Sequence, residues 1–129
     1  MEKQVIVIGE ITLEWSNWAI WEDIKIDCRS GCGIHIPNNK PGVYEVRIKN
    51  KDERLTIGKA SDLRMRGRQA LVKGKVPHSS GDNIRNNEDV SQIEVRWAQA
   101  NRPAAVEEEL HKLYREKYNG HMPKYTGHT

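Results

Sequence analysis

The chain has no apolar run that approaches the ~20 residues of a membrane-spanning helix. Its first ten residues also lack the long apolar stretch and small-residue cleavage site of a secretory signal. With 30% charged residues and a mean hydropathy of −0.80, the sequence predicts a soluble, cytoplasmic protein. Its 129 residues suffice for a single domain that buries a core without disulfides or metal.

Cysteine is scarce. Cys28 and Cys32 occur in the segment Cys-Arg-Ser-Gly-Cys, and His35 follows three residues later. A structural zinc site usually needs four ligands at a recognisable spacing, and no second cysteine pair follows. We therefore expect two reduced cysteines of a cytosolic protein rather than a metal site.

Excess charge of either sign is also small. The 21 basic and 18 acidic residues give a formal charge of +3, so net charge does not decide for or against a nucleic-acid partner. Local clusters of charge are more informative than net charge. An acidic run at residues 107–109 lies far along the chain from the main basic segment. That segment contains Arg64, Arg66, Arg68, Lys73 and Lys75.

The N-terminal part predicts a strand followed by a short helix. Residues 4–8 form a β-branched run that is typical of a strand. Trp15, Trp18 and Trp21 recur every three residues, which suits a short helix over residues 13–21 that buries one face. If the three rings were exposed instead, they would suit an interaction surface.

Residues 42–58 predict a β-hairpin. Alternation in the first strand places Tyr44, Val46 and Ile48 on one face of the sheet. A turn of polar residues follows, and the second strand is expected to end at Gly58.

The rest of the chain predicts helices around one further strand. The expected elements are a helix over 61–72, a mostly irregular segment over 74–92 with a short helix near 82–87, and a strand over 93–97. A last helix is expected from Pro103 to about 119. Its apolar stripe would consist of Val106, Leu110, Leu113 and Tyr114. This order predicts an α+β fold: a small, mainly antiparallel, three-stranded sheet flanked by helices. Residues 1–40 are expected to form an N-terminal extension packed on a core of residues 41–129.

Five short motifs follow one another along this core. They are Gly42-Val43-Tyr44, Thr56-Ile57-Gly58, the segment from Lys59 to Arg66, Val106-Glu107-Glu108-Glu109-Leu110, and Pro123-Lys124-Tyr125-Thr126. Their order and spacing over residues 41–126 resemble the GIY-YIG nuclease superfamily, and especially the nuclease domain of the bacterial excision-repair incision subunit. The resemblance implies a metal-dependent endonuclease that hydrolyses DNA phosphodiester bonds.

The resemblance assigns three catalytic positions, and Lys59 is added as a supporting cation. Tyr44 is the expected general base, and Lys59 is a nearby cation that could lower the high pKa of a phenol. Arg66 falls on the arginine position of the family, where a guanidinium clamps phosphate oxygens. Glu107 is the expected ligand of Mg²⁺ or Mn²⁺, since Mg²⁺ takes few protein carboxylates and keeps several waters.

Basic residues near the catalytic arginine are expected to contact the nucleic acid. Arg64, Arg68 and Lys73 are the candidates for backbone contacts to DNA, with RNA as the alternative substrate. The late polar residue of the family corresponds to Asn119 by counting from the glutamate, and to Thr126 by its sequence context.

Two positions depart from the family pattern. The tyrosine of the YIG element is Thr56, which has no titratable phenol, and the position four after the arginine, often Tyr or His in the family, is Ala70. His78 and Lys59 are candidates to replace the missing group. The departures leave a second function open, a non-catalytic nucleic-acid-binding module on the same fold.

Overall fold

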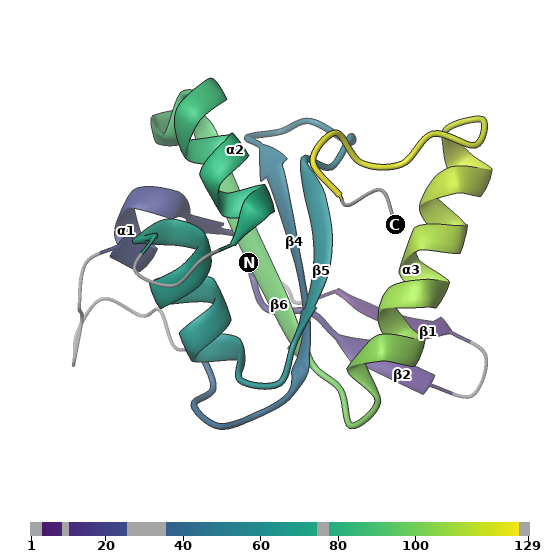
Figure 1. Cartoon of the computed structure of the whole chain (residues 1–129). Helices are drawn as coiled ribbons and strands as arrows, with labels where there is room; N and C mark the ends of the chain where they lie inside the picture. Colours follow the sequence, from purple (N-terminus) through teal and green to yellow (C-terminus); the bar gives the residue numbers. More distant parts are fainter. Residues whose placement is uncertain (1–3, 9–10, 26–35, 75–77, 127–129) are drawn as a thin grey trace.

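A four-stranded antiparallel sheet lies at the centre of the protein (Figure 1). The computed structural model describes residues 4–8, 11–25, 36–74 and 78–126. The sheet has the strand order β3-β6-β4-β5 and consists of β3 (Ala19–Ile20), β6 (Ile93–Gln99), β4 (Gly42–Ile48) and β5 (Thr56–Ala60). A separate antiparallel hairpin joins β1 (Val5–Ile8) and β2 (Ile11–Glu14).

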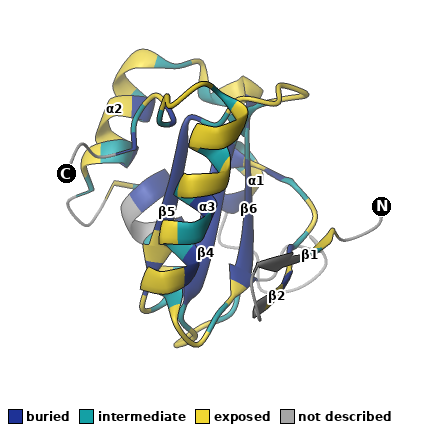
Figure 2. Ribbon diagram, turned by 90° about the vertical axis from the view of Figure 1, so that its right-hand side faces the viewer, coloured by how far each residue is buried: buried dark blue, intermediate teal, exposed yellow. Residues whose placement is uncertain are grey.

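Helices cover both faces of the sheet. On one face lie α1 (Trp21–Lys25), η1 (Met65–Val72), which has the wide π-helical winding, and α2 (Ser79–Asn87). On the other lie α3 (Pro103–Lys117) and the β1-β2 hairpin. A short 3₁₀ turn, η2 (Val90–Gln92), leads into β6. Figure 2 shows that the sheet is the buried layer while the outer faces of the helices are exposed.

Alternation along β4 divides the core into two clusters. Tyr44 and Val46 pack with the residues of α1, η1 and α2, whereas Val43 packs with Val106 and Leu110 of α3. This division confirms the face predicted for the first hairpin strand. Leu113 is 47% exposed, however, so the apolar stripe of α3 is narrower than predicted.

The α+β class is confirmed, but the sheet has four strands rather than three. The extra strand is β3, which pairs with β6 through Ala19 and Val95. The predicted helix over residues 13–21 is wrong, because that segment contains the end of β2 and all of β3. Spacing alone cannot reveal such pairing, since the partner strand lies over 70 residues away along the chain.

The tryptophans also differ from the prediction. Trp15 and Trp21 are 0% and 1% exposed and belong to different core clusters, which one helix face could not achieve. Trp18 is half-buried, and the guanidinium groups of Arg47 and Arg96 lie against its ring. Their burial counts against an exposed tryptophan surface for interaction.

The hairpin and the later elements are found as predicted, with changed boundaries. Gly58 pairs with Tyr44 and lies inside β5 rather than at its end.

The residues considered for a zinc site, Cys28, Cys32 and His35, lie outside the described residues. Among the described residues, no helix has the length and apolar character needed to cross a membrane.

The C-terminal segment, residues 121–126, runs along the outer edge of β5, and we call it the C-terminal strap (yellow in Figure 1). The Tyr125 N–H donates to the Leu55 carbonyl at 2.7 Å, and the Ile57 N–H donates to Thr126 Oγ1 at 3.0 Å. These bonds satisfy polar groups of an edge strand that would otherwise be unpaired. The strap therefore fixes the strand that carries the second motif.

Candidate active site

A polar pocket of about 270 Å³ lies against β5, between the helices of the two sheet faces. Its lining comes from β4, β5, η1, α2, α3, and the C-terminal strap. The ionisable side chains in this lining are Tyr44, Lys59, Arg66, His78, Glu107 and His111.

The structure brings together all four residues that the motifs assigned to catalysis. Tyr44, Lys59, Arg66 and Glu107 line this one pocket although they come from four different elements or their ends. Of the predicted nucleic-acid contacts, Arg64 and Lys73 are half-buried and lie outside the lining. The side chain of Arg68 is outside the described part of the chain.

Gly58 makes room for the Tyr44 ring. The two residues are cross-strand partners, and a Cβ on Gly58 would lie 2.4 Å from the Tyr44 hydroxyl oxygen. A Cβ on Gly42 would similarly lie 2.2 Å from the Ala98 carbonyl oxygen. The glycines of the two hairpin motifs are therefore explained by close packing, and Gly58 in particular places the phenol in the pocket.

His78 holds the Tyr44 hydroxyl. The Gly81 N–H at the start of α2 donates to His78 Nδ1 at 2.9 Å, so Nδ1 is an acceptor. In a neutral ring the hydrogen is then on Nε2, which lies 2.9 Å from Tyr44 Oη and donates to it. Burial, together with the positive charges of Arg66 and Arg85, lowers the pKa of His78 from 6.5 to about 4, so the ring is neutral at pH 7.

Tyr44 stays protonated at neutral pH. Burial raises its pKa well above the ordinary value of 10, and the negative charge of Glu107 raises it further. The positive charge of Arg66 lowers it by less than burial raises it. The hydroxyl accepts from His78, so its own hydrogen can be donated to a ligand oxygen.

Arg66 has a donor without a partner. Its Nε is buried and meets no hydrogen-bond partner within the described part of the chain. A buried, unsatisfied donor is costly, and a cation is more so. Arg66 also lines the pocket, where its cationic guanidinium suits the predicted contact to phosphate.

Glu107 and Lys59 form an ion pair in the lining of the pocket. Lys59 Nζ lies 3.9 Å from Glu107 Oε1, and the side chains are 53% and 22% exposed. Within residues 4–8, 11–25, 36–74 and 78–126, no group of three His, Cys, Asp or Glu side chains is placed to hold a metal. A single carboxylate oxygen fits Mg²⁺ or Mn²⁺ only if water and substrate oxygens complete the coordination, as is usual for Mg²⁺.

Other pocket residues were missed or left open by the sequence. His111 lies one helical turn beyond Glu107, and its Nε2 is 2.9 Å from the Ile57 carbonyl oxygen. That i, i+4 spacing is the one sequence signal that points to it. Of the two candidates for the late polar residue, Thr126 lines the pocket and Asn119 does not.

Thr56 has a structural role beside the pocket. It is 2% exposed, and its hydroxyl lies 3.2 Å from that of Thr126. The Thr56 hydroxyl therefore helps to hold the C-terminal strap.

No family model matches the chain, and no curated protein or solved structure matches it either. Its function must therefore be inferred from the pocket itself.

Proposed function

We propose that the protein is a metal-dependent endonuclease that hydrolyses DNA phosphodiester bonds on a GIY-YIG-like fold. One observation carries the proposal: the four motif residues Tyr44, Lys59, Arg66 and Glu107 line a single polar pocket. Packing alone does not require such an assembly, since none of the four except Tyr44 belongs to the hydrophobic core.

The roles follow from the chemistry of the side chains. Arg66 and Lys59 bind the negatively charged phosphate, and Tyr44 donates its hydroxyl hydrogen to a phosphate oxygen. Glu107 would hold the metal ion, which supplies positive charge where the transition state gains negative charge.

An adjacent hollow extends the pocket along the protein surface. It shares Lys59 and Arg66 with the pocket and adds Arg102. A polyanionic strand is longer than one phosphate, so this second basic lining supports a nucleic-acid substrate over a small phosphate ester. Arg64, Arg68 and Lys73 remain the proposed contacts to flanking DNA, with RNA as the alternative.

Nicking of supercoiled plasmid DNA with Mg²⁺ or Mn²⁺ tests the proposal. Glu107→Gln and Tyr44→Phe should each lower the rate by about 100-fold or more, because each removes a group that contacts the reacting centre. Glu108→Gln is the matched control, since Glu108 is the exposed neighbour on the same helix, and it should nick like the unchanged protein. Equal trace nicking by all four proteins, or nicking that survives EDTA, would end the proposal.

The second candidate is a non-catalytic nucleic-acid-binding module. The burial of Thr56 and its bond to Thr126 favour it, because that position cannot act as a base. It predicts metal-independent, salt-sensitive binding that is lost when Arg64, Arg66 and Arg68 are replaced by alanine. Binding of oligonucleotides that is unaffected by this triple replacement would remove the second candidate.

A further inference from the structure

Backbone hydrogen bonds hold the two histidines of the pocket in the same tautomer, with the hydrogen on Nε2, but the surroundings of their Nδ1 atoms differ. His111 Nε2 lies 2.9 Å from the Ile57 carbonyl oxygen, which can only accept a hydrogen bond. The hydrogen of a neutral His111 ring is therefore on Nε2, and the lone pair of Nδ1 has no hydrogen-bond partner in the part of the chain that the structure describes. An imidazole oriented through one nitrogen, with the other free to accept a proton, is the usual arrangement of a general base.

His78 has both nitrogens in use. Its Nδ1 accepts from the Gly81 N–H, and its Nε2 donates to Tyr44 Oη. Because Nε2 already carries a hydrogen, Tyr44 cannot pass its own proton to His78. This removes the relay through which a buried phenol could act as a base.

We propose that His111 Nδ1 is the general base of the reaction, an inference that rests on the proposed endonuclease function. The attacking water gives a proton to His111 Nδ1 as its oxygen forms a bond to phosphorus. The bond from phosphorus to the leaving sugar oxygen breaks with its electron pair, and that oxygen takes a proton from solvent. His111 then releases its proton to solvent.

The other described groups of the pocket suit the role less well. Tyr44 is a phenol whose pKa is raised by burial, and Lys59 is a cation near Glu107. Ser80 Oγ donates to the Tyr125 carbonyl at 2.7 Å. The hydroxyls of Thr56 and Thr126 bond to each other and are not basic at neutral pH. His111 is left as the side chain with a basic, uncommitted nitrogen among the described lining residues.

The inference also accounts for a departure from the family pattern. Thr56 replaces the second tyrosine of the motifs, so a base at that position is lost. His111 reaches β5 from α3, on the carbonyl of the residue that follows Thr56. The proton acceptor would thus come from the glutamate helix instead of from the hairpin.

His111→Gln and His111→Ala test the assignment by single-turnover nicking at saturating DNA and metal. The glutamine amide can still donate to the Ile57 carbonyl but is not a base, so His111→Gln separates the chemistry from the packing. Both variants should lose about 10²- to 10⁴-fold in rate while DNA binding is retained. Imidazole added to His111→Ala should restore part of the rate, and it should not rescue Glu107→Gln.

His121→Gln is the control, since His121 is exposed and outside the pocket. Nicking by His111→Gln at the rate of the unchanged protein, with Glu107→Gln inactive, would overturn the base and leave the endonuclease standing. A rate loss that is reversed by higher Mn²⁺ concentration would make His111 a metal ligand and would also overturn it. No nicking by the unchanged protein would remove the function and this role together.

Discussion

The position of the Tyr44 hydroxyl depends on residue 58 being a glycine, which has no side chain. The ring occupies the space that a Cβ at residue 58 would need, at 2.4 Å from the hydroxyl oxygen and 2.5 Å from Cζ. The hydroxyl is also held by His78, whose Nε2 lies 2.9 Å from it. Residue 58 therefore controls whether the phenol lies in the pocket.

Gly58→Ala should lower the free energy of unfolding by about 1–3 kcal/mol, because overpacking must displace a buried ring. Urea unfolding measures the change. Gly67→Ala is the matched control: among the described residues its Cβ would meet Ile36 Cδ1 at 3.6 Å, an ordinary contact, so stability should not fall. Equal effects of the two substitutions would show that the ring of Tyr44 is not tightly held.

His78 makes stability depend on pH. Its pKa is about 4 in the folded protein and 6.5 when exposed, so the unfolded chain binds the proton first as the pH falls. Stability is then full above pH 6.5 and is lost as the pH falls from 6.5 towards 4. The loss should be on the order of 1–2 kcal/mol, since the ring is partly exposed and screened by solvent.

His78→Asn isolates this contribution. Asparagine is a good N-cap that can accept from the Gly81 N–H but does not titrate, so the variant should lose stability less steeply between pH 6.5 and pH 4. Thermal melts over this range, with His121→Asn as the control, measure the slope. An unchanged slope in His78→Asn would contradict the low pKa of His78.

At the level of elements, local patterns predicted the hairpin and the last helix. Alternation placed Tyr44 and Val46 on one face, and the spacing of Val106 and Leu110 placed Glu107 near the sheet. Both signals repeat within a few residues, so one sequence reveals them. These patterns predicted where Tyr44 and Glu107 lie, whereas their selection as site residues came from the resemblance of the motifs.

Long-range pairing could not be predicted in the same way. Strand β3 has two residues and exists because it bonds β6, far along the chain. The bond from His111 to the Ile57 carbonyl requires α3 to dock on β5, which nothing in either segment encodes by itself. Residues whose roles depend on such docking, including His78 and Thr126, were therefore only partly identified.

The C-terminal strap is an element whose contribution can be measured. Thr126 is 7% exposed, accepts the Ile57 N–H at 3.0 Å and contacts the Thr56 hydroxyl. Thr126→Val keeps the shape but leaves the Ile57 N–H unpaired, which should cost about 1–3 kcal/mol in stability.

Thr126→Ser is the matched variant, because it retains the hydroxyl and loses only a methyl group. Urea unfolding should therefore place Thr126→Ser between the unchanged protein and Thr126→Val. If the valine variant were as stable as the serine variant, the bond to β5 would contribute nothing and the strap would be held by other contacts.

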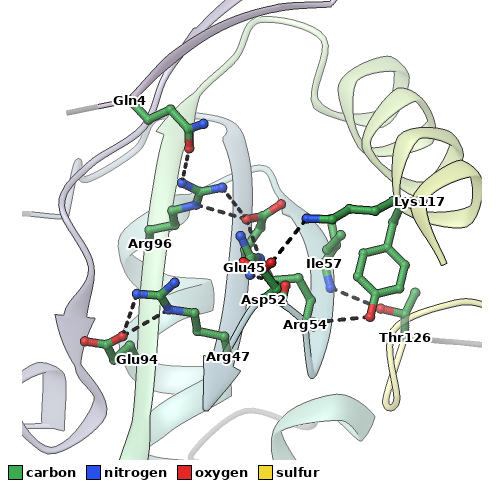
Figure 3. A network of polar contacts seen from close by, with 11 residues as sticks. Gln4, Glu45, Arg47, Asp52, Arg54, Ile57, Glu94, Arg96, Lys117 and Thr126 are labelled. Atoms are coloured by element: carbon green, nitrogen blue, oxygen red, sulfur yellow. Dashed lines mark hydrogen bonds and ion pairs between the residues drawn. The ribbon is translucent and has the colours of Figure 1, made fainter. Parts of the chain in front are cut away.

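On the scale of the whole molecule, a buried charge network connects the N-terminal segments to the sheet (Figure 3). Glu45 Oε1 accepts from Arg54 at 2.8 Å and from Arg96 at 2.7 Å. Arg96 also donates to Gln4 Oε1 at 2.6 Å, and its guanidinium lies 4.3 Å from the centre of the Trp15 ring. One carboxylate thus balances two arginines that contact the N-terminal residues.

Glu45→Gln should destabilise the protein by about 3–5 kcal/mol, because it leaves the buried Arg96 and the half-buried Arg54 without their negatively charged partner. The pair of Asp52 and Lys117, drawn in the same figure, is the control. Its side chains are 81% and 60% exposed at a distance of 3.7 Å, so Asp52→Asn should cost at most about 1 kcal/mol. Urea unfolding followed by tryptophan fluorescence reports both, since Trp15 and Trp18 lie against these arginines. If the two variants lost similar, small amounts of stability, Glu45 would not be needed to hold the N-terminal segments on the sheet. The apolar contacts of Leu13 and Trp15 would then be enough to hold them there.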